Sequence, residues 1–423
     1  MKVKDIRDRI LWLFIGFFIF ALAVHIPIPG INRVVWEKLL NQGELFQLLG
    51  MFTGGALNKF SIAAMGITPY INASIIMQLL TVIWPQLKDL QKEGGEMGRK
   101  KIAQYTRGLT IVLACLQATM MTVSLNHFRE SIFLSKNPVF LFGVILTMIA
   151  GTCFLIWLGE TISEKSLGNG VSLLIFAGIV MSYPSYLMNT LAQAKVGGPR
   201  AVIALGIFFF VCVAIIVSII VMTMGYRKVP VQYPKRQVGN KVYGGQSTYI
   251  PIKVNNAGVI SIIFAVSIMY LPTTLAGFIP PDSSPVLLRI QETVRMVFNP
   301  SANWYNLLYF LFVVFFTFFY SAIALNVEDL ADNLKKAGGF IPGIRPGRPT
   351  SEYMERLVNR LTLVAALYLG VLAVLPTMLM KLTGVTTFYL GATSLLIIVG
   401  VALDTMQQIQ ARVVMRDYQG FLK

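Results

Sequence analysis

The sequence predicts an all-α polytopic membrane protein with ten transmembrane helices. Its 423 residues are 55% hydrophobic and only 13% charged, and the mean hydropathy is +0.67. Soluble domains usually carry about 25% charged residues, so this composition argues against a water-soluble globular fold. The number of spans then follows from the stretches without Asp, Glu, Lys or Arg, because about 20 helical residues cross a bilayer.

Ten charge-free windows are long enough to span a bilayer. Helices are expected in them, because a span must satisfy its own backbone polar groups and barrel strands would alternate in polarity. In chain order the windows are 10–32, 60–87, 108–128, 137–159, 166–194, 201–226, 254–281, 296–327, 361–380 and 382–403.

The first window and the last two windows differ from the others. The first window follows the basic start MKVKDIRDR, but it is too long for a typical signal peptide and lacks a small-residue cleavage site, so we expect a retained span. The last two windows are separated only by Lys381, and the turn-like residues around it predict two spans joined by a short loop.

The second window is unusual because glycine and proline interrupt it. It is preceded by the small-residue stretch GMFTGGALNKF (50–60) and contains Gly66 and Pro69, which can break or redirect a helix. Two interpretations fit. Either a short half-inserted helix over 55–65 precedes a true span from about residue 69, or the segment is one kinked helix.

The basic charge indicates orientation. The formal net charge is +17, which in a soluble protein would suggest nucleic-acid binding. With the N-terminus in the cytoplasm, 26 of the 36 Lys and Arg residues fall on the cytoplasmic side. The positive-inside rule therefore predicts that both termini are cytoplasmic.

Three predicted cytoplasmic loops, 85–107, 225–253 and 327–360, hold most of the polar residues. The second has six basic residues and no acidic one, and the third contains the tip GGFIPGIRPGRPT. Its prolines and glycines should prevent helix formation. The tip is then either a solvated loop or a docking site for an acidic partner, including RNA phosphates.

Residues for catalysis or cofactor binding are scarce. The chain has two histidines, His25 and His127, three scattered cysteines and no nucleotide-binding loop, so no catalytic residue, metal or cofactor is predicted. Apart from His25, the ten windows lack ionisable residues that couple transport to ions. A passive pathway is favoured over the two rivals, a ten-span small-solute carrier and an intramembrane enzyme.

Five spans per half would place two structural repeats in opposite orientation. The expected halves are 1–200 and 201–423, although sequence similarity between them is too weak to prove a repeat.

Long motifs spread over the chain resemble the SecY family, the channel-forming subunits of the bacterial Sec protein translocase. The motifs are IPIPGI (26–31), MFTGGALNKFSI (51–62), GITPYINASIIMQLLTV (66–82), GNGVSLLIFAGIV (168–180), PVQYPKRQVG (230–239), QSTYIPIKVNNAGVI (246–260), ADNLKKAGGFIPGIRPG (331–347) and FYLGATSLLI (388–397). The resemblance implies two pseudo-symmetric, inverted five-helix halves around a central hourglass pore in the plasma membrane.

The resemblance also implies a pore ring and a plug. The aliphatic pore ring would be Ile67, Ile71, Val171, Ile175, Ile263 and Ile397. The plug, about residues 54–64, would include Gly54, Gly55, Ala56, Leu57, Asn58, Phe60, Ser61 and Ile62. A lateral gate between spans two and three and spans seven and eight would release apolar segments into lipid, with Gln78 expected to hold it shut through a hydrogen bond.

The implied partners are the small subunits SecE and SecG, the SecA ATPase, the ribosome, signal sequences, nascent chains and the lipid bilayer. The two basic loops would dock SecA and the ribosome through Lys235, Arg236, Arg345 and Arg348. Two departures from the family pattern are Ser261, where many relatives have proline, and Val171, where isoleucine is more usual.

Overall fold

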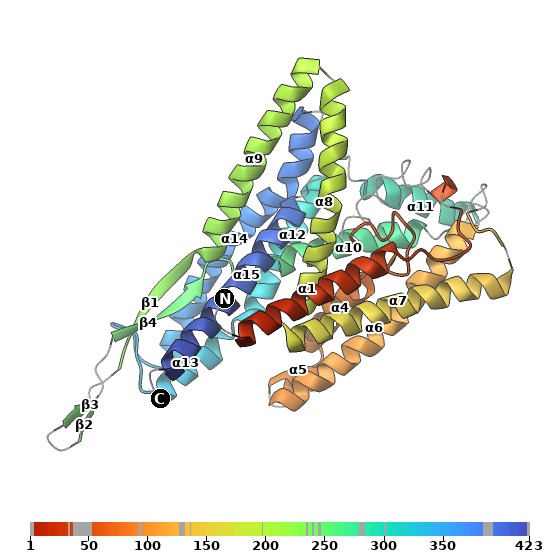
Figure 1. Ribbon diagram of the computed structural model, residues 1–423. Coiled ribbons are helices and arrows are strands. Elements are labelled where there is room, and N and C mark those ends of the chain that lie inside the picture. Colours follow the sequence, from red (N-terminus) through yellow and green to blue (C-terminus); the bar gives the residue numbers. More distant parts are fainter. Residues whose placement is uncertain are drawn as a thin grey trace.

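The structure is a computed structural model dominated by long helices (Figure 1). It describes residues 4–32, 34–36, 53–92, 95–126, 132–135, 137–196, 198–233, 236–238, 241–243, 247–277, 279, 284–299, 302–383 and 392–420. The helices are α1 (Lys4–His25), α4 (Thr68–Ile83), α5 (Pro85–Lys92), α6 (Gly95–Asn126), α7 (Pro138–Lys165), α8 (Gly170–Val196), α9 (Gly198–Met224), α10 (Ile260–Gly277), α11 (Pro285–Val297), α12 (Asn303–Ala324), α13 (Val327–Lys336), α14 (Arg348–Thr383) and α15 (Ala392–Gly420). The strands are β1 (Tyr226–Gln232), β2 (Arg236–Val238), β3 (Lys241–Tyr243) and β4 (Ser247–Lys253).

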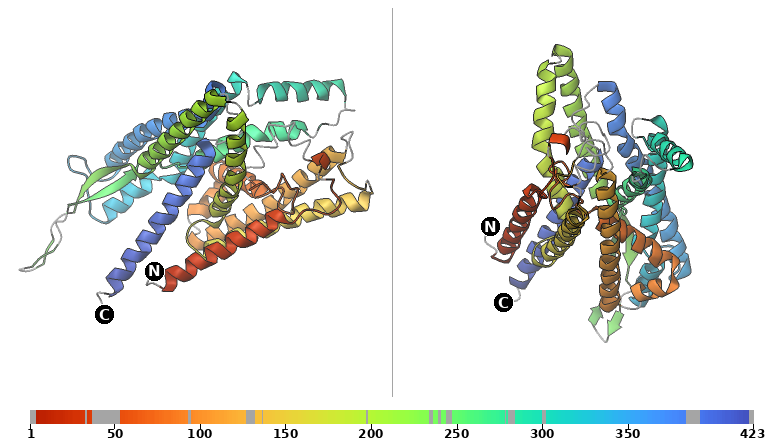
Figure 2. Two further views of the ribbon diagram at one scale, coloured as in Figure 1. Left: turned by 45° about the horizontal axis from the view of Figure 1, so that its top comes forward. Right: turned by 90° about the vertical axis from the view of Figure 1, so that its right-hand side faces the viewer.

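Ten helices account for the ten predicted spans. In the described part of the chain, α1, α6, α7, α8, α9, α12, α14 and α15 are long and apolar enough to cross a membrane. Two shorter apolar segments, Thr68–Ile83 and Ile260–Met269, complete the set. The start of α1 and the end of α15 lie at the same end of the molecule (Figures 1 and 2), as an even number of spans requires.

The helices extend beyond their charge-free windows. α6 begins at Gly95 and α14 at Arg348, so both carry a charged turn or more before the apolar segment. The prediction that the whole tip at 338–350 is non-helical is therefore wrong at its end. Arg348, Pro349 and Thr350 form the first turn of α14, where proline is tolerated because its missing N–H has no helical partner.

The basic loop at 225–253 contains strands that the sequence analysis did not predict. β1 and β4 pair antiparallel from Tyr226↔Lys253 to Gln232↔Ser247, and β2 and β3 form a second short pair beyond them. We call the β1–β4 pair the ribbon (Figure 1). Val229 and Val231 alternate with exposed residues on β1, which is the pattern of a strand with one buried face.

Two apolar clusters fill most of the membrane part. One lies among α9, α10, α12, α14 and α15 and includes the buried Phe264, Phe316 and Leu369. The other lies among α1, α7, α8 and α15 and includes Phe20, Leu155 and Leu174. α4 contacts both, so it lies along the seam between the two parts of the bundle.

Candidate functional site

The six predicted ring residues lie in one apolar cluster. Ile67, Ile175 and Ile397 are 2–6% exposed, and the other three are partly buried against the same cluster. The six come from α8, α10, α15 and the start of α4: Ile67, Ile71, Val171, Ile175, Ile263 and Ile397. A constriction built only from branched aliphatic side chains can exclude water and ions by dewetting.

The segment 53–67 directly precedes α4 and has an irregular backbone. It forms successive turns, so the prediction of a half-inserted helix over 55–65 is wrong, while α4 begins at Thr68, close to the predicted residue 69. Gly54, Gly55 and Gly66 have φ values of 68°, 79° and 57°, and Phe60 has 44°. These left-handed residues prevent a continuous right-handed helix.

The predicted plug is nonetheless packed into the bundle. Ala56 and Ala63 belong to the ring cluster, while Leu57 and Phe60 belong to a neighbouring cluster with Met148 of α7. The eight plug residues are distributed as follows: Gly54, Ala56, Leu57, Phe60 and Ser61 are buried, Gly55 and Ile62 are partly buried, and Asn58 is exposed. The predicted plug therefore shares one apolar cluster with the predicted ring residues and a second cluster with α7.

Two glycines on neighbouring helices let the plug approach their backbones. A Cβ added at Gly151 of α7 would lie 1.8 Å from the carbonyl oxygen of Ile62. A Cβ added at Gly54 would lie 2.9 Å from the Cα atom of Gly178 in α8. We call Gly151 and Gly178 the glycine seat. Neither glycine could be identified from the sequence, since a lone glycine in an apolar helix does not show what it packs against.

Gln78 does not make the expected hydrogen bond across the gate. Its side-chain nitrogen donates to the Ser74 oxygen at 3.4 Å, one turn back on the same helix. The Gln78 side-chain oxygen is buried and has no partner among the described residues. Among the described residues, Gln78 therefore makes no hydrogen bond to a neighbouring helix.

Apolar packing closes the seam instead. Ile71, Ile75 and Leu79 follow one another at four-residue spacing on α4, so they share one helix face. All three pack into the cluster formed mainly by α9, α10, α12 and α14. Dispersion contacts of this kind are individually weak and non-directional, so the two parts can separate without leaving polar groups unpaired.

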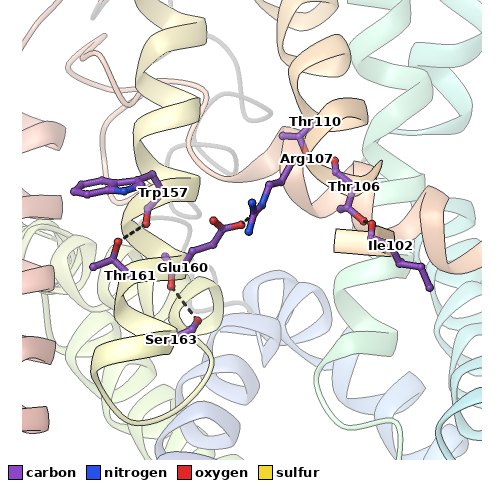
Figure 3. Close-up of polar contacts among 9 residues, drawn as sticks. Ile102, Thr106, Arg107, Thr110, Trp157, Glu160, Thr161 and Ser163 are labelled. Carbon is purple, nitrogen blue, oxygen red and sulfur yellow. Dashed lines mark hydrogen bonds and ion pairs between the residues drawn. The ribbon is translucent and has the colours of Figure 1, made fainter. Parts of the chain in front are cut away.

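On either side of the seam, polar contacts join neighbouring helices. Arg107 of α6 and Glu160 of α7 form an ion pair at 2.5 Å (Figure 3). On the other side of the seam, the Ser321 and Thr362 hydroxyls form a hydrogen bond at 2.7 Å, and the Thr377 hydroxyl donates to Asn306 at 2.9 Å; both pairs join α12 to α14. These contacts tie α6 to α7 and α12 to α14.

Three of the four predicted docking residues, Arg236, Arg345 and Arg348, fall in the described part of the chain. Arg345 is exposed, and its side chain has no partner in the described part of the chain, while Arg348 pairs with Glu352 at 3.2 Å. Arg236 lies in β2, and Lys235 falls outside the described residues.

The two basic loops form one packed unit. Val231 of the ribbon, Leu334 of α13 and Ile341 of the tip share a cluster with the start of α14. Gln232 and Phe340 also exchange backbone hydrogen bonds at 2.9 and 3.0 Å. The tip that carries Arg345 is thus fixed to the ribbon, a long-range contact that the sequence analysis did not predict.

Curated relatives match the whole chain. A translocase subunit SecY from Thermotoga maritima is 42% identical, with coverage of 100% of this chain and 96% of the relative. The corresponding subunit from Aquifex aeolicus is 41% identical, with coverage of 100% and 98%.

Solved structures show the same fold. A protein-conducting channel aligns with a TM-score of 0.67 at 18% identity over 98% of this chain and 94% of the other. A second structure, with a TM-score of 0.65, 18% identity and the same coverage, is of a SecY protein whose plug domain is described as stabilising the closed state and maintaining a membrane seal. The SecY family model matches residues 61–406. Together with the full-length relatives, this match shows that the chain belongs to the SecY family.

Proposed function

We propose that this chain is the central subunit of a protein-conducting channel that moves unfolded secretory polypeptides across the plasma membrane. The observation that carries the proposal is the ring cluster, in which six aliphatic side chains from both parts of the bundle meet beside the plug. Such a constriction contacts an extended polypeptide without selecting a sequence. It also resists water and ions when closed.

The seam along α4 supplies the lateral exit. When Ile71, Ile75 and Leu79 separate from their apolar partners, a transmembrane segment of the nascent chain can replace those contacts. Transfer of that segment into lipid is favourable by about 0.8 kcal/mol per buried CH₂ group. Release of transmembrane segments therefore needs no chemical step in this chain.

The energy for transport comes from partners. We assign SecE and SecG as small subunits, and SecA or the translating ribosome as the driving partner at the ribbon and tip. The exposed Arg345 and the basic ribbon suit an acidic protein surface or RNA phosphates. With these loops in the cytoplasm, both termini are cytoplasmic as well.

Reconstitution tests this function. The chain, assembled with SecE and SecG in liposomes, should import a secretory precursor when SecA and ATP are added, and should not do so without ATP. Uptake of a small solute together with no precursor import would establish the rival carrier and refute the channel.

The ring makes a separate prediction. Burial of one isoleucine stabilises the closed ring by about 2 kcal/mol, and serine does not replace that contribution. The double variant Ile175→Ser, Ile397→Ser should therefore raise the resting ion conductance about tenfold or more. Ile219→Ser is the matched control, because Ile219 is equally buried but lies outside the ring cluster. An unchanged conductance in the double variant, measured in planar bilayers, would mean that the seal lies elsewhere.

A further inference from the structure

Residues 26–32 and 34–36, which follow α1, lie between the plug and the residues before α7. At one end they pair with the plug through two backbone hydrogen bonds. The Ile28 N–H donates to the Phe60 carbonyl at 3.0 Å, and the Ile62 N–H donates to the Ile26 carbonyl at 3.0 Å. We call these residues the strap.

The other end of the strap is fixed to the helical bundle. The Asn32 N–H donates to the Ile132 carbonyl at 2.8 Å, and the Leu134 N–H donates to the Gly30 carbonyl at 3.0 Å. Residues 132–134 lie just before α7, which also carries Gly151 of the glycine seat. The strap therefore joins the plug to residues that precede the helix against which the plug is packed.

Trp36 adds a side-chain contact from the strap to the plug. It is only 1% exposed, and its indole N–H donates to the Leu57 carbonyl at 2.8 Å. The same ring meets Phe60 edge-to-face with centroids 4.8 Å apart. A buried indole N–H is costly to leave without its acceptor, so this bond favours one plug position over all others.

Two exposed residues of the plug face a cavity. Asn58 and Lys59 are exposed, and a cavity of about 500 Å³ lies between the strap and this part of the plug. The cavity is lined by the strap, by His25 and Trp36, and by plug residues 58–60. Asn58 and Lys59 face this cavity, so the directional bond from Trp36 to the neighbouring Leu57 contributes to the balance between the seated and displaced plug.

The geometry points to Trp36 as a latch, a positioning residue that holds the plug in the closed channel and sets how often the plug leaves. This inference rests on the proposed channel function, because a latch on the plug regulates transport only if the plug closes a channel. The latch acts through the Leu57 carbonyl and the Phe60 ring. Opening must break both contacts together with the strap's two hydrogen bonds to the plug.

The test is hydrogen–deuterium exchange on the full channel assembled with SecE and SecG in nanodiscs. Trp36→Phe keeps an aromatic ring but removes the N–H donor. Loss of the hydrogen bond from the Trp36 indole to the Leu57 carbonyl should speed exchange of the plug amides in 53–67 by about fivefold. The amides of Ser61, Ile62 and Ala64 are the most informative, because each donates a backbone hydrogen bond in the seated plug.

Trp304→Phe is the matched control, since Trp304 lies at the start of α12 and is 61% exposed. It should leave exchange over 53–67 unchanged. Trp36→Ala, which also removes the ring, should exceed the effect of Trp36→Phe. Exchange over 53–67 that is the same in the unchanged channel and in both Trp36 variants would overturn the latch.

Resting ion conductance separates failure of the latch from failure of the proposed function. If the chain forms a channel and the latch is correct, Trp36→Phe should raise conductance about as much as it raises exchange. If a variant lacking the plug conducts but Trp36→Phe changes neither conductance nor exchange, the latch is wrong and the channel stands. If even the variant lacking the plug does not conduct, the channel proposal fails, while faster exchange in Trp36→Phe would still show the contact to be a latch on this segment.

Discussion

Gly151→Val is expected to produce a channel that leaks ions at rest. The added side chain would begin 1.8 Å from the Ile62 carbonyl oxygen, and the plug backbone cannot stay where it is. Overpacking of this kind costs about 1–3 kcal/mol. Because α7 is fixed by its neighbours while the plug is irregular, the plug should move and raise the resting conductance by about tenfold or more.

Gly143→Val provides the control on the same helix. A Cβ at Gly143 would meet no atom within 4 Å, so this substitution adds the same volume without touching the plug. Conductance of purified channels in planar bilayers should rise for Gly151→Val alone. If the two variants leak equally, or neither leaks, the close contact between α7 and the plug does not contribute to the seal.

Arg345→Glu is expected to slow SecA-driven import by about thirtyfold while leaving the fold intact. Loss of one partner from a hydrogen-bonded charge pair at an interface typically costs about 2 kcal/mol or more. The exposed Arg345 side chain has no partner in the described part of the chain, and the tip is held by other contacts. One of these is the bond from the Thr350 hydroxyl to the Arg345 backbone carbonyl at 2.9 Å.

The matched charge reversal is Arg289→Glu on α11. Arg289 is exposed, and α11, which carries it, lies at the opposite end of the bundle from the ribbon (Figure 1). Its reversal should leave import unchanged. ATP-dependent import of a secretory precursor and the melting temperature would be measured together. Normal import by a folded Arg345→Glu channel would remove this arginine from the docking site.

Much of the fold could be predicted from the sequence. The windows without charges marked the spans, because placing an ionised side chain in hydrocarbon is costly at almost every position. The same reasoning failed at boundaries such as Arg348, where a helix continues past the membrane into water and charged residues no longer limit it.

Local irregular structure was predicted less well. Glycines near residue 55 and at Gly66 indicated a break, but not whether the segment before α4 would form a short helix or turns. The outcome depends on backbone pairing with the strap, where Ile62 bonds to Ile26. That pairing joins residues 36 positions apart, and no local pattern specifies it.

The Gln78 hydrogen bond was the clearest wrong expectation about the site. A polar residue in an apolar span suggests a partner on a neighbouring helix. Here the Gln78 side-chain nitrogen donates a hydrogen bond to Ser74 on the same helix. The face made by Ile71, Ile75 and Leu79 packs across the seam. The rotation of α4 decides which face meets the other part of the bundle, and this is a property of the packed structure.

The sequence by itself determined that this is a ten-span membrane protein with basic loops, since bilayer thickness and charge solvation act on local stretches of chain. Only the tertiary structure brought the six ring residues into one cluster, placed Gly151 against the plug and joined Trp36 to Leu57. These contacts connect segments far apart in sequence. Close packing and directional hydrogen bonds between such segments depend on how whole helices come together, which hydropathy does not encode.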